Sequence, residues 1–224
     1  MISLLIYGIL QTKEMSEITP YDRGSERGYQ TERRKETMEH QNLSATEAMD
    51  RLKEGNKRYL EAESNTGDIS PKIRQKTCDE GQSPYAIVIT CSDSRVIPES
   101  IFMAGIGELF TIRVAGNVMD NHQLGSVEYA ADHLGSNLVV VLGHTHCGAV
   151  GATIGSEPAG FVKYITDEIK AAIGEEKDEF KASCLNVQRS VTRIKEGLKL
   201  TDADKLKVCG AVYHIDTGRV EFLD

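Results

Sequence analysis

The sequence predicts an α/β protein in which a mostly parallel sheet is flanked by helices and preceded by an N-terminal helical arm. Three short apolar runs rich in β-branched residues predict buried strands, over residues 85–90, 109–114 and 138–142. Segments whose apolar residues recur with helical spacing separate these runs. Strands that alternate with helices are typical of a parallel sheet covered on both faces.

The composition fits one globular domain and excludes several classes of protein. The chain has 224 residues, 40% of them hydrophobic, and a formal net charge of −8. Because an acidic chain repels phosphate backbones, we expect no nucleic-acid partner. No apolar stretch approaches the about 20 residues that cross a bilayer, so we expect no membrane span. Five cysteines, an odd number at low density, favour a reducing compartment, and we expect a cytoplasmic protein.

Residues 1–43 are expected to form a flexible extension, and residues 44–224 a single domain. The first ten residues are apolar, but they lack the positively charged start and the cleavage site of a signal peptide. A polar run follows as far as Asn42, and a regulatory or membrane-touching arm is an alternative. Order is predicted to begin at Ser44, which forms a capping box with Glu47 and starts a helix.

The remaining elements follow in order along the chain. Residues 67–81 are interpreted as a loop with a short helical piece, broken by Pro71. Apolar spacing predicts the later helices, over residues 98–103, 123–134, 161–173 and 184–197. A turn at residues 216–218 predicts a final pair of strands, over residues 207–214 and 219–223.

Polar loops follow the first and third predicted strands, and both should open on the same edge of the sheet, where α/β proteins bind ligands. The first loop carries Cys91, and the second carries His144 and Cys147. Two thiolates and an imidazole suit Zn²⁺, and three protein ligands leave the fourth position open, as in catalytic zinc sites. The alternative is two buried free cysteines and a capping histidine.

Asp93 and Arg95 lie two residues apart beside the proposed zinc ion. They could form a structural ion pair that holds the loop. They could also act in catalysis, with Arg95 orienting Asp93 so that its carboxylate accepts a hydrogen bond from the zinc-bound water. The two roles are compatible. Whether Asp93 can itself occupy the fourth zinc position is left open.

Four motifs occur in order: C-S-D-S-R (91–95), R-x-A-G-N (113–117), G-S-V-E-Y-A (125–130) and G-H-T-H-C-G-A (143–149). Together they resemble the β-carbonic anhydrase family, from about residue 44 to the C-terminus. The resemblance implies a Rossmann-like subunit, assembled as a homodimer or homotetramer, with one zinc ion per chain. It implies reversible hydration of carbon dioxide to bicarbonate and a proton, by attack of zinc-bound hydroxide.

The resemblance also implies residues that bind the substrate. Gln82 would hydrogen-bond the substrate of a neighbouring subunit, and the amide of Gly148 would face the substrate. An apolar pocket would be lined by Phe110, Ala115 and Tyr129. From the residues alone, Gln82 is a loop glutamine, and the three pocket residues belong to the core.

Three other functions are compatible with parts of this pattern. The same scaffold could hydrolyse carbon disulfide or carbonyl sulfide, because those substrates are also linear and apolar. Cys91 and His144 could instead form a metal-free nucleophilic pair in a hydrolase. A non-catalytic zinc-binding assembly protein is the third alternative. It needs neither the Asp93–Arg95 pair nor Gln82.

Overall fold

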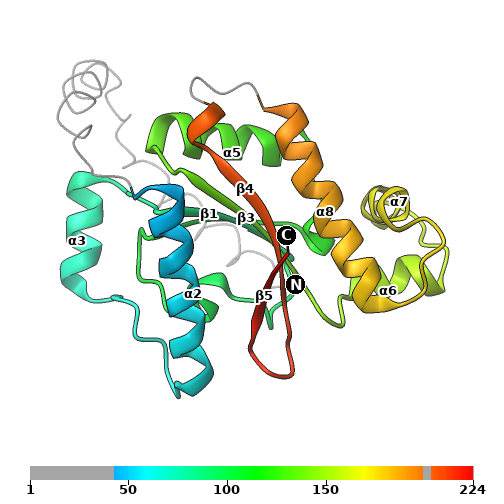
Figure 1. Ribbon diagram of the computed structural model, residues 1–224, viewed down its shortest axis with the longest axis horizontal. Helices are drawn as coiled ribbons and strands as arrows, with labels where there is room; N and C mark the ends of the chain where they lie inside the picture. Colours follow the sequence, from blue (N-terminus) through cyan, green and yellow to red (C-terminus); the bar gives the residue numbers. More distant parts are fainter. Residues whose placement is uncertain (1–42, 199–202, 224) are drawn as a thin grey trace, which may run out of the picture. The chain divides into compact units, whose positions relative to one another are not determined.

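The computed structural model describes residues 43–198 and 203–223. In these ranges a five-stranded sheet has the order β2-β1-β3-β4-β5 (Figure 1). Neighbouring strands are parallel from β2 to β4, and β5 is antiparallel to β4. The strands are β1 (Ala86–Thr90), β2 (Leu109–Arg113), β3 (Leu138–His144), β4 (Lys207–Tyr213) and β5 (Val220–Leu223). The predicted fold class, a mostly parallel α/β sheet, is confirmed.

Helices flank the sheet, with α2 on one side and α5 and α8 on the other (Figure 1). The helices are α2 (Ala45–Glu61), α3 (Pro71–Glu80), α4 (Pro98–Ile101), α5 (Asn121–Leu134), α6 (Gly148–Gly155), α7 (Val162–Ile173) and α8 (Glu179–Gly197). Within the described ranges, two short 3-10 turns accompany them, at Ala115–Asn117 and Ala203–Lys205.

The central strands are buried on both faces. Val88 of β1 packs in one core cluster with Leu52 of α2. Its neighbour Ile87 packs in a second cluster on the opposite face, with Val127 of α5 and Val187 of α8. Because each face of the sheet needs apolar side chains, β1 and β3 are continuous apolar runs rather than alternating ones.

Two helix starts show how the sequence sets the boundaries. The predicted capping box of α2 is present, since the Ser44 amide donates to Glu47 Oε2 (2.8 Å) and the Glu47 amide donates to Ser44 Oγ (3.3 Å). The interpretation of Pro71 as a break is wrong. Pro71 is the first residue of α3, and Ser70 caps the helix. At this first position a backbone N–H would have no acceptor within the helix, so proline loses no hydrogen bond there.

Three elements differ from those predicted. Strand β3 continues to His144 instead of ending at Leu142. Helix α6 was not predicted, because three glycines weaken its helix propensity. Helix α8 begins at Glu179, five residues before the predicted start, with Asp178 accepting a hydrogen bond from the Lys181 amide. His144 is therefore a strand residue, and α6 starts directly after Cys147.

No helix in residues 43–198 and 203–223 has the length and apolar composition needed to cross a bilayer. The predicted extension over residues 1–43 lies, apart from Leu43, outside the described residues.

Candidate metal centre

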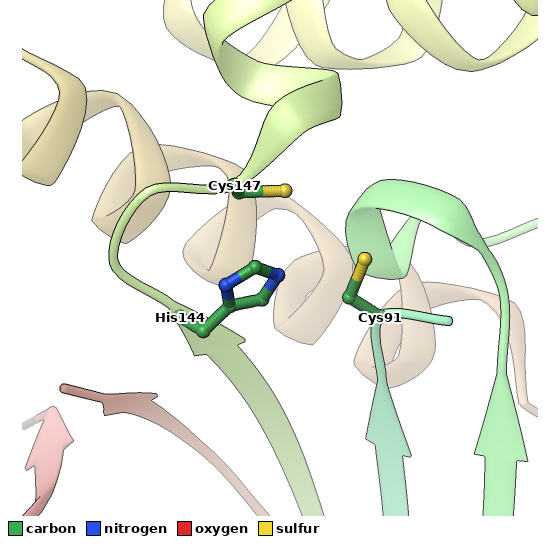
Figure 2. A group of neighbouring side chains, drawn as sticks. All are labelled: Cys91, His144 and Cys147. Atoms are coloured by element: carbon green, nitrogen blue, oxygen red, sulfur yellow. The ribbon is translucent and has the colours of Figure 1, made fainter. Parts of the chain in front are cut away.

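The pairing of β1 with β3 brings the two polar loops together. Thr90 of β1 lies opposite Leu142 of β3, so both strands point the same way and end at one edge of the sheet. Cys91 directly follows β1, and His144 is the last residue of β3. Cys147 returns toward them through a tight loop in which His146 has a φ of 54°. The candidate ligand atoms of Cys91, His144 and Cys147 lie within 4.8 Å of one another, and Figure 2 shows them facing one common space.

The imidazole of His144 is oriented as a metal ligand would be. The side chain is 1% exposed, and its Nδ1 lies 2.9 Å from the carbonyl oxygen of Thr145. Because a carbonyl only accepts, Nδ1 carries the proton, and the lone pair of Nε2 points away from that carbonyl. Nε2 is buried and has no hydrogen-bond partner among the described residues. Coordination of a metal ion would satisfy this buried acceptor.

The two thiols are buried, each 6% exposed, and interact with one another. A hydrogen bond from Cys147 lowers the pKa of Cys91 to about 4. The same hydrogen bond, together with burial, raises the pKa of Cys147. A divalent cation favours both thiolates, and two thiolates with one imidazole suit zinc. The residues present thus fit the predicted metal.

Asp93 lies beside the cluster, clamped by Arg95. The guanidinium donates from Nε to Oδ1 (3.0 Å) and from Nη2 to Oδ2 (2.7 Å). This pairing holds the pKa of Asp93 well below its ordinary range. Asp93 Oδ2 lies 4.0 Å from Nε2 of His144. An anionic acceptor of fixed orientation therefore lies next to the histidine nitrogen of the cluster.

Arginines also tie the loops to one another, and for Arg113 this role was not evident from the sequence. Its Nε donates to the carbonyl of Cys91 (3.2 Å), and its Nη2 donates to the carbonyl of Asp93 (2.7 Å). Arg95 Nη2 also donates to the carbonyl of His146 (3.1 Å), which joins the first loop to the second. The available signal was the position of Arg113 at the end of β2, opposite Thr90 of the neighbouring strand.

Comparison with known proteins identifies the family. The family model described as carbonic anhydrase matches residues 86–220. A carbonic anhydrase of Mycolicibacterium smegmatis is 37% identical over 200 residues, covering 80% of this chain and 94% of that protein. A tetrameric β-carbonic anhydrase of Sordaria macrospora superposes with a TM-score of 0.62 at 26% identity, over 69% of this chain and 87% of that chain. The chain belongs to the β-carbonic anhydrase family.

Membership of the β-carbonic anhydrase family makes the chain an enzyme, as the motifs predict. A Coccomyxa β-carbonic anhydrase, solved in complex with acetazolamide, is a further structural relative. It has a TM-score of 0.58 at 28% identity and covers 70% of this chain and 87% of that chain. The matched family region starts with β1 and ends at the first residue of β5. It therefore includes the whole cluster, the Asp93–Arg95 pair and Arg113.

The residues expected to bind substrate fall into two groups. Ala115 precedes Gly116, whose amide reaches Cys91 Sγ, and Gly148 follows Cys147 as the first residue of α6. Both therefore lie next to the cluster.

The second group lies elsewhere in the subunit. The rings of Phe110 and Tyr129 contact each other across β2 and α5, with centroids 6.2 Å apart. Gln82 is exposed before the start of β1, at the end of that strand opposite Cys91. Their roles, and that of Gln82 across a subunit interface, remain predictions.

Proposed function

We propose that the chain catalyses the reversible hydration of carbon dioxide to bicarbonate and a proton, with one zinc ion held by Cys91, His144 and Cys147. The observation that carries this proposal is a buried cluster of two thiols and one imidazole with the Arg95-clamped carboxylate of Asp93 beside it. Among the described residues the cluster has three metal-binding side chains, whereas structural zinc sites usually have four.

A bound zinc ion would make a water molecule nucleophilic near neutral pH, as zinc is known to do in the carbonic anhydrases that hold it with three histidines. Asp93 is held in one orientation by Arg95, so its carboxylate would accept a hydrogen bond from that water and orient it. The amide of Gly148, at the N-terminus of α6, has no intrahelical partner and can donate to a substrate oxygen. Ala115 offers a small apolar surface to carbon dioxide.

The test of this proposal is zinc analysis combined with stopped-flow hydration of carbon dioxide. Purified protein is expected to hold one zinc ion per chain and to acidify a buffered indicator on mixing with carbon dioxide. Stripping with a chelator should abolish the activity, and zinc should restore it. Full activity of the stripped protein would contradict the metal role. A zinc-loaded protein that hydrolyses carbon disulfide or carbonyl sulfide but leaves carbon dioxide unchanged would contradict the substrate.

A reducing compartment, the cytoplasm, is the proposed location. The five cysteines all lie in the described part of the chain, and each is free of disulfide bonds. Because zinc binding requires reduced Cys91 and Cys147, a reducing environment keeps the proposed site competent.

The active form is proposed to be at least a homodimer. Gln82 lies before β1, and the side chains of Phe110 and Tyr129 contact each other on β2 and α5. We infer that these three residues serve the site of a neighbouring subunit. Strand β2 is an edge of the sheet, and Tyr129 is 46% exposed. A second subunit meeting this edge could receive these three side chains at its own metal centre. The tetrameric assembly of the Sordaria relatives supports an oligomeric form.

Mixing two inactive variants is expected to restore activity. In a hybrid dimer of a Gln82→Ala subunit and a Cys147→Ala subunit, the first keeps its metal centre and receives the intact Gln82 of the second. One complete site results, so the mixture, unfolded and refolded together, should exceed either variant alone. If Gln82 served its own subunit, the hybrid would contain no complete site. A mixture no more active than its parents, or a fully active monomer in sedimentation, would refute the proposal.

A further inference from the structure

The 3-10 turn Ala115–Asn117 lies directly against one of the proposed zinc ligands. The amide of Gly116 donates to Cys91 Sγ over 3.2 Å. Gly116 has a φ of 67° and Asn117 a φ of 45°, so two successive residues adopt left-handed backbone conformations. Such a conformation is rare for a residue with a side chain, and asparagine tolerates it better than most. The turn therefore needs support from its surroundings to keep the amide aimed at the sulfur.

Helix α8 supplies that support through two buried hydrogen bonds. Asn186 Nδ2 donates to the carbonyl of Gly116 (2.8 Å), and Ser190 Oγ donates to the carbonyl of Asn117 (3.1 Å). Both side chains are 3% exposed and lie one helical turn apart. Two consecutive carbonyls of the turn are thus fixed to one rigid element.

Packing around Gly116 leaves the turn little freedom on its other side. A Cβ at this position would lie 2.8 Å from Ile169 Cδ1 of α7 and 3.0 Å from the Cβ of Ala149 in α6. Three helices therefore surround the turn, but only α8 contributes the two hydrogen bonds to its carbonyls. Because a buried amide is unfavourable unless it is hydrogen-bonded, the bond to Gly116 also explains a polar residue at this buried position of α8.

We propose that Asn186 is a positioning residue of the metal centre, holding the Gly116 amide so that it donates to the Cys91 sulfur and keeps that sulfur oriented toward the metal. A hydrogen bond to a metal-bound thiolate withdraws charge from the sulfur, and groups around the ligands commonly tune a metal in this way. This inference rests on the proposed zinc ligation by Cys91. It adds a residue from outside the four motifs, two hydrogen bonds away from the ligand sulfur.

The test removes the side-chain amide of Asn186 in two ways, with and without loss of volume. Asn186→Leu keeps nearly the same shape and removes the donor, and Asn186→Ala removes both the donor and the bulk. The matched control is Gln188→Ala, at an exposed position of the same helix. Zinc affinity is measured by competition with a chelator. In cobalt-substituted protein, the energy of the thiolate-to-cobalt charge-transfer band is measured.

Both Asn186 variants are expected to bind zinc about 10-fold more weakly or worse, the usual effect of losing a group that orients a ligand. Their charge-transfer band should move to lower energy, because a sulfur without its hydrogen bond gives up an electron to the metal more readily. Gln188→Ala should change neither quantity. A merely structural role of Asn186 would lower the melting temperature and leave the band unshifted. Asn186 variants with wild-type affinity and band energy would overturn the inference.

A second measurement needs no variant and so remains decisive if the substitutions prevent folding. In wild-type protein loaded with ¹¹³Cd, the amide proton of Gly116 should show scalar coupling to the metal through the N–H···S hydrogen bond. Absence of that coupling in a cadmium-loaded protein would overturn this inference but leave the proposed function standing. Wild-type protein that binds none of these metals would overturn the proposed function, and the inference with it.

Discussion

Cys147→Ala is expected to remove most of the bound zinc and, with it, nearly all hydration of carbon dioxide. The substitution deletes one of two thiolates from a buried three-ligand set. It also deletes the hydrogen bond that lowers the pKa of Cys91, so the remaining thiol holds its proton more tightly. Loss of a group that only orients a ligand lowers metal affinity by up to about 100-fold. Because Cys147 is a proposed ligand itself, zinc affinity should fall by more than that. Metal content after dialysis and stopped-flow hydration measure the two effects.

The control for this experiment is another cysteine of the same chain. Cys184 lies on α8, is partly buried and does not belong to the cluster, so Cys184→Ala should keep zinc and activity. Full zinc and full activity in Cys147→Ala would show that the proposed ligand set is wrong. Equal zinc loss in both variants would point to a general effect of removing a thiol.

Asp93→Asn is expected to keep its zinc but to lose activity by about 100-fold, the upper range for a group that orients a metal-bound ligand. The amide has the shape of the carboxylate but carries no charge. It can no longer accept two charge-assisted hydrogen bonds from Arg95, so its orientation is weakened. The Nδ2 of asparagine donates and cannot accept, so it would repel the hydrogen-bond donor of the nucleophile. The measurements are zinc content and stopped-flow hydration at constant pH.

The control is Asp167→Asn, which makes the same chemical change at a residue with no proposed role in the site. Asp167 forms an exposed ion pair with Lys163 on α7. This variant should leave zinc content and hydration unchanged. If Asp93→Asn loses as much zinc as Cys147→Ala, then Asp93 is an essential ligand rather than an orienting group. Wild-type activity in Asp93→Asn would remove Asp93 from the mechanism.

The lowered pKa of Asp93 excludes protonation of this residue as the cause of a loss of activity near neutral pH. A carboxyl group with a depressed pKa stays ionised until the pH falls below even the ordinary value, which is about 3.9 for aspartate. Protonation of Asp93 therefore does not account for activity lost between pH 7 and pH 5. Such a loss would have to come from other groups at the site.

The sequence predicted the strands and the cluster for one physical reason. A buried parallel strand needs apolar residues on both faces, so β1 and β3 are recognisable as runs, and the polar residues that follow them mark the strand ends. Once two parallel strands are expected to end at the same edge, Cys91, His144 and Cys147 can be grouped without knowing any distance. The pairing of β1 with β3 then brings their side chains together.

Contacts between distant segments explain what the sequence did not predict. Arg113 and Asn186 donate to backbone carbonyls. Every residue has a backbone carbonyl, so the sequence does not indicate which one a distant side chain will contact. Helix α6 is rich in glycine, so packing rather than propensity determines it. The proposed roles of Gln82, Phe110 and Tyr129 would depend on a second subunit, which the periodicity of one chain does not encode.

The separation of the cluster residues along the chain sets the order of events during synthesis. Cys91 leaves the ribosome long before His144 and Cys147, and as a lone thiol it offers only one of the three metal-binding groups. The set becomes complete only when β3 has paired with β1 at the centre of the sheet. Because a site of this kind does not exist in an unfolded chain, capture of the proposed metal would follow formation of the sheet's central pair. Metal loading of a nascent chain would thus report that its central strands have already paired.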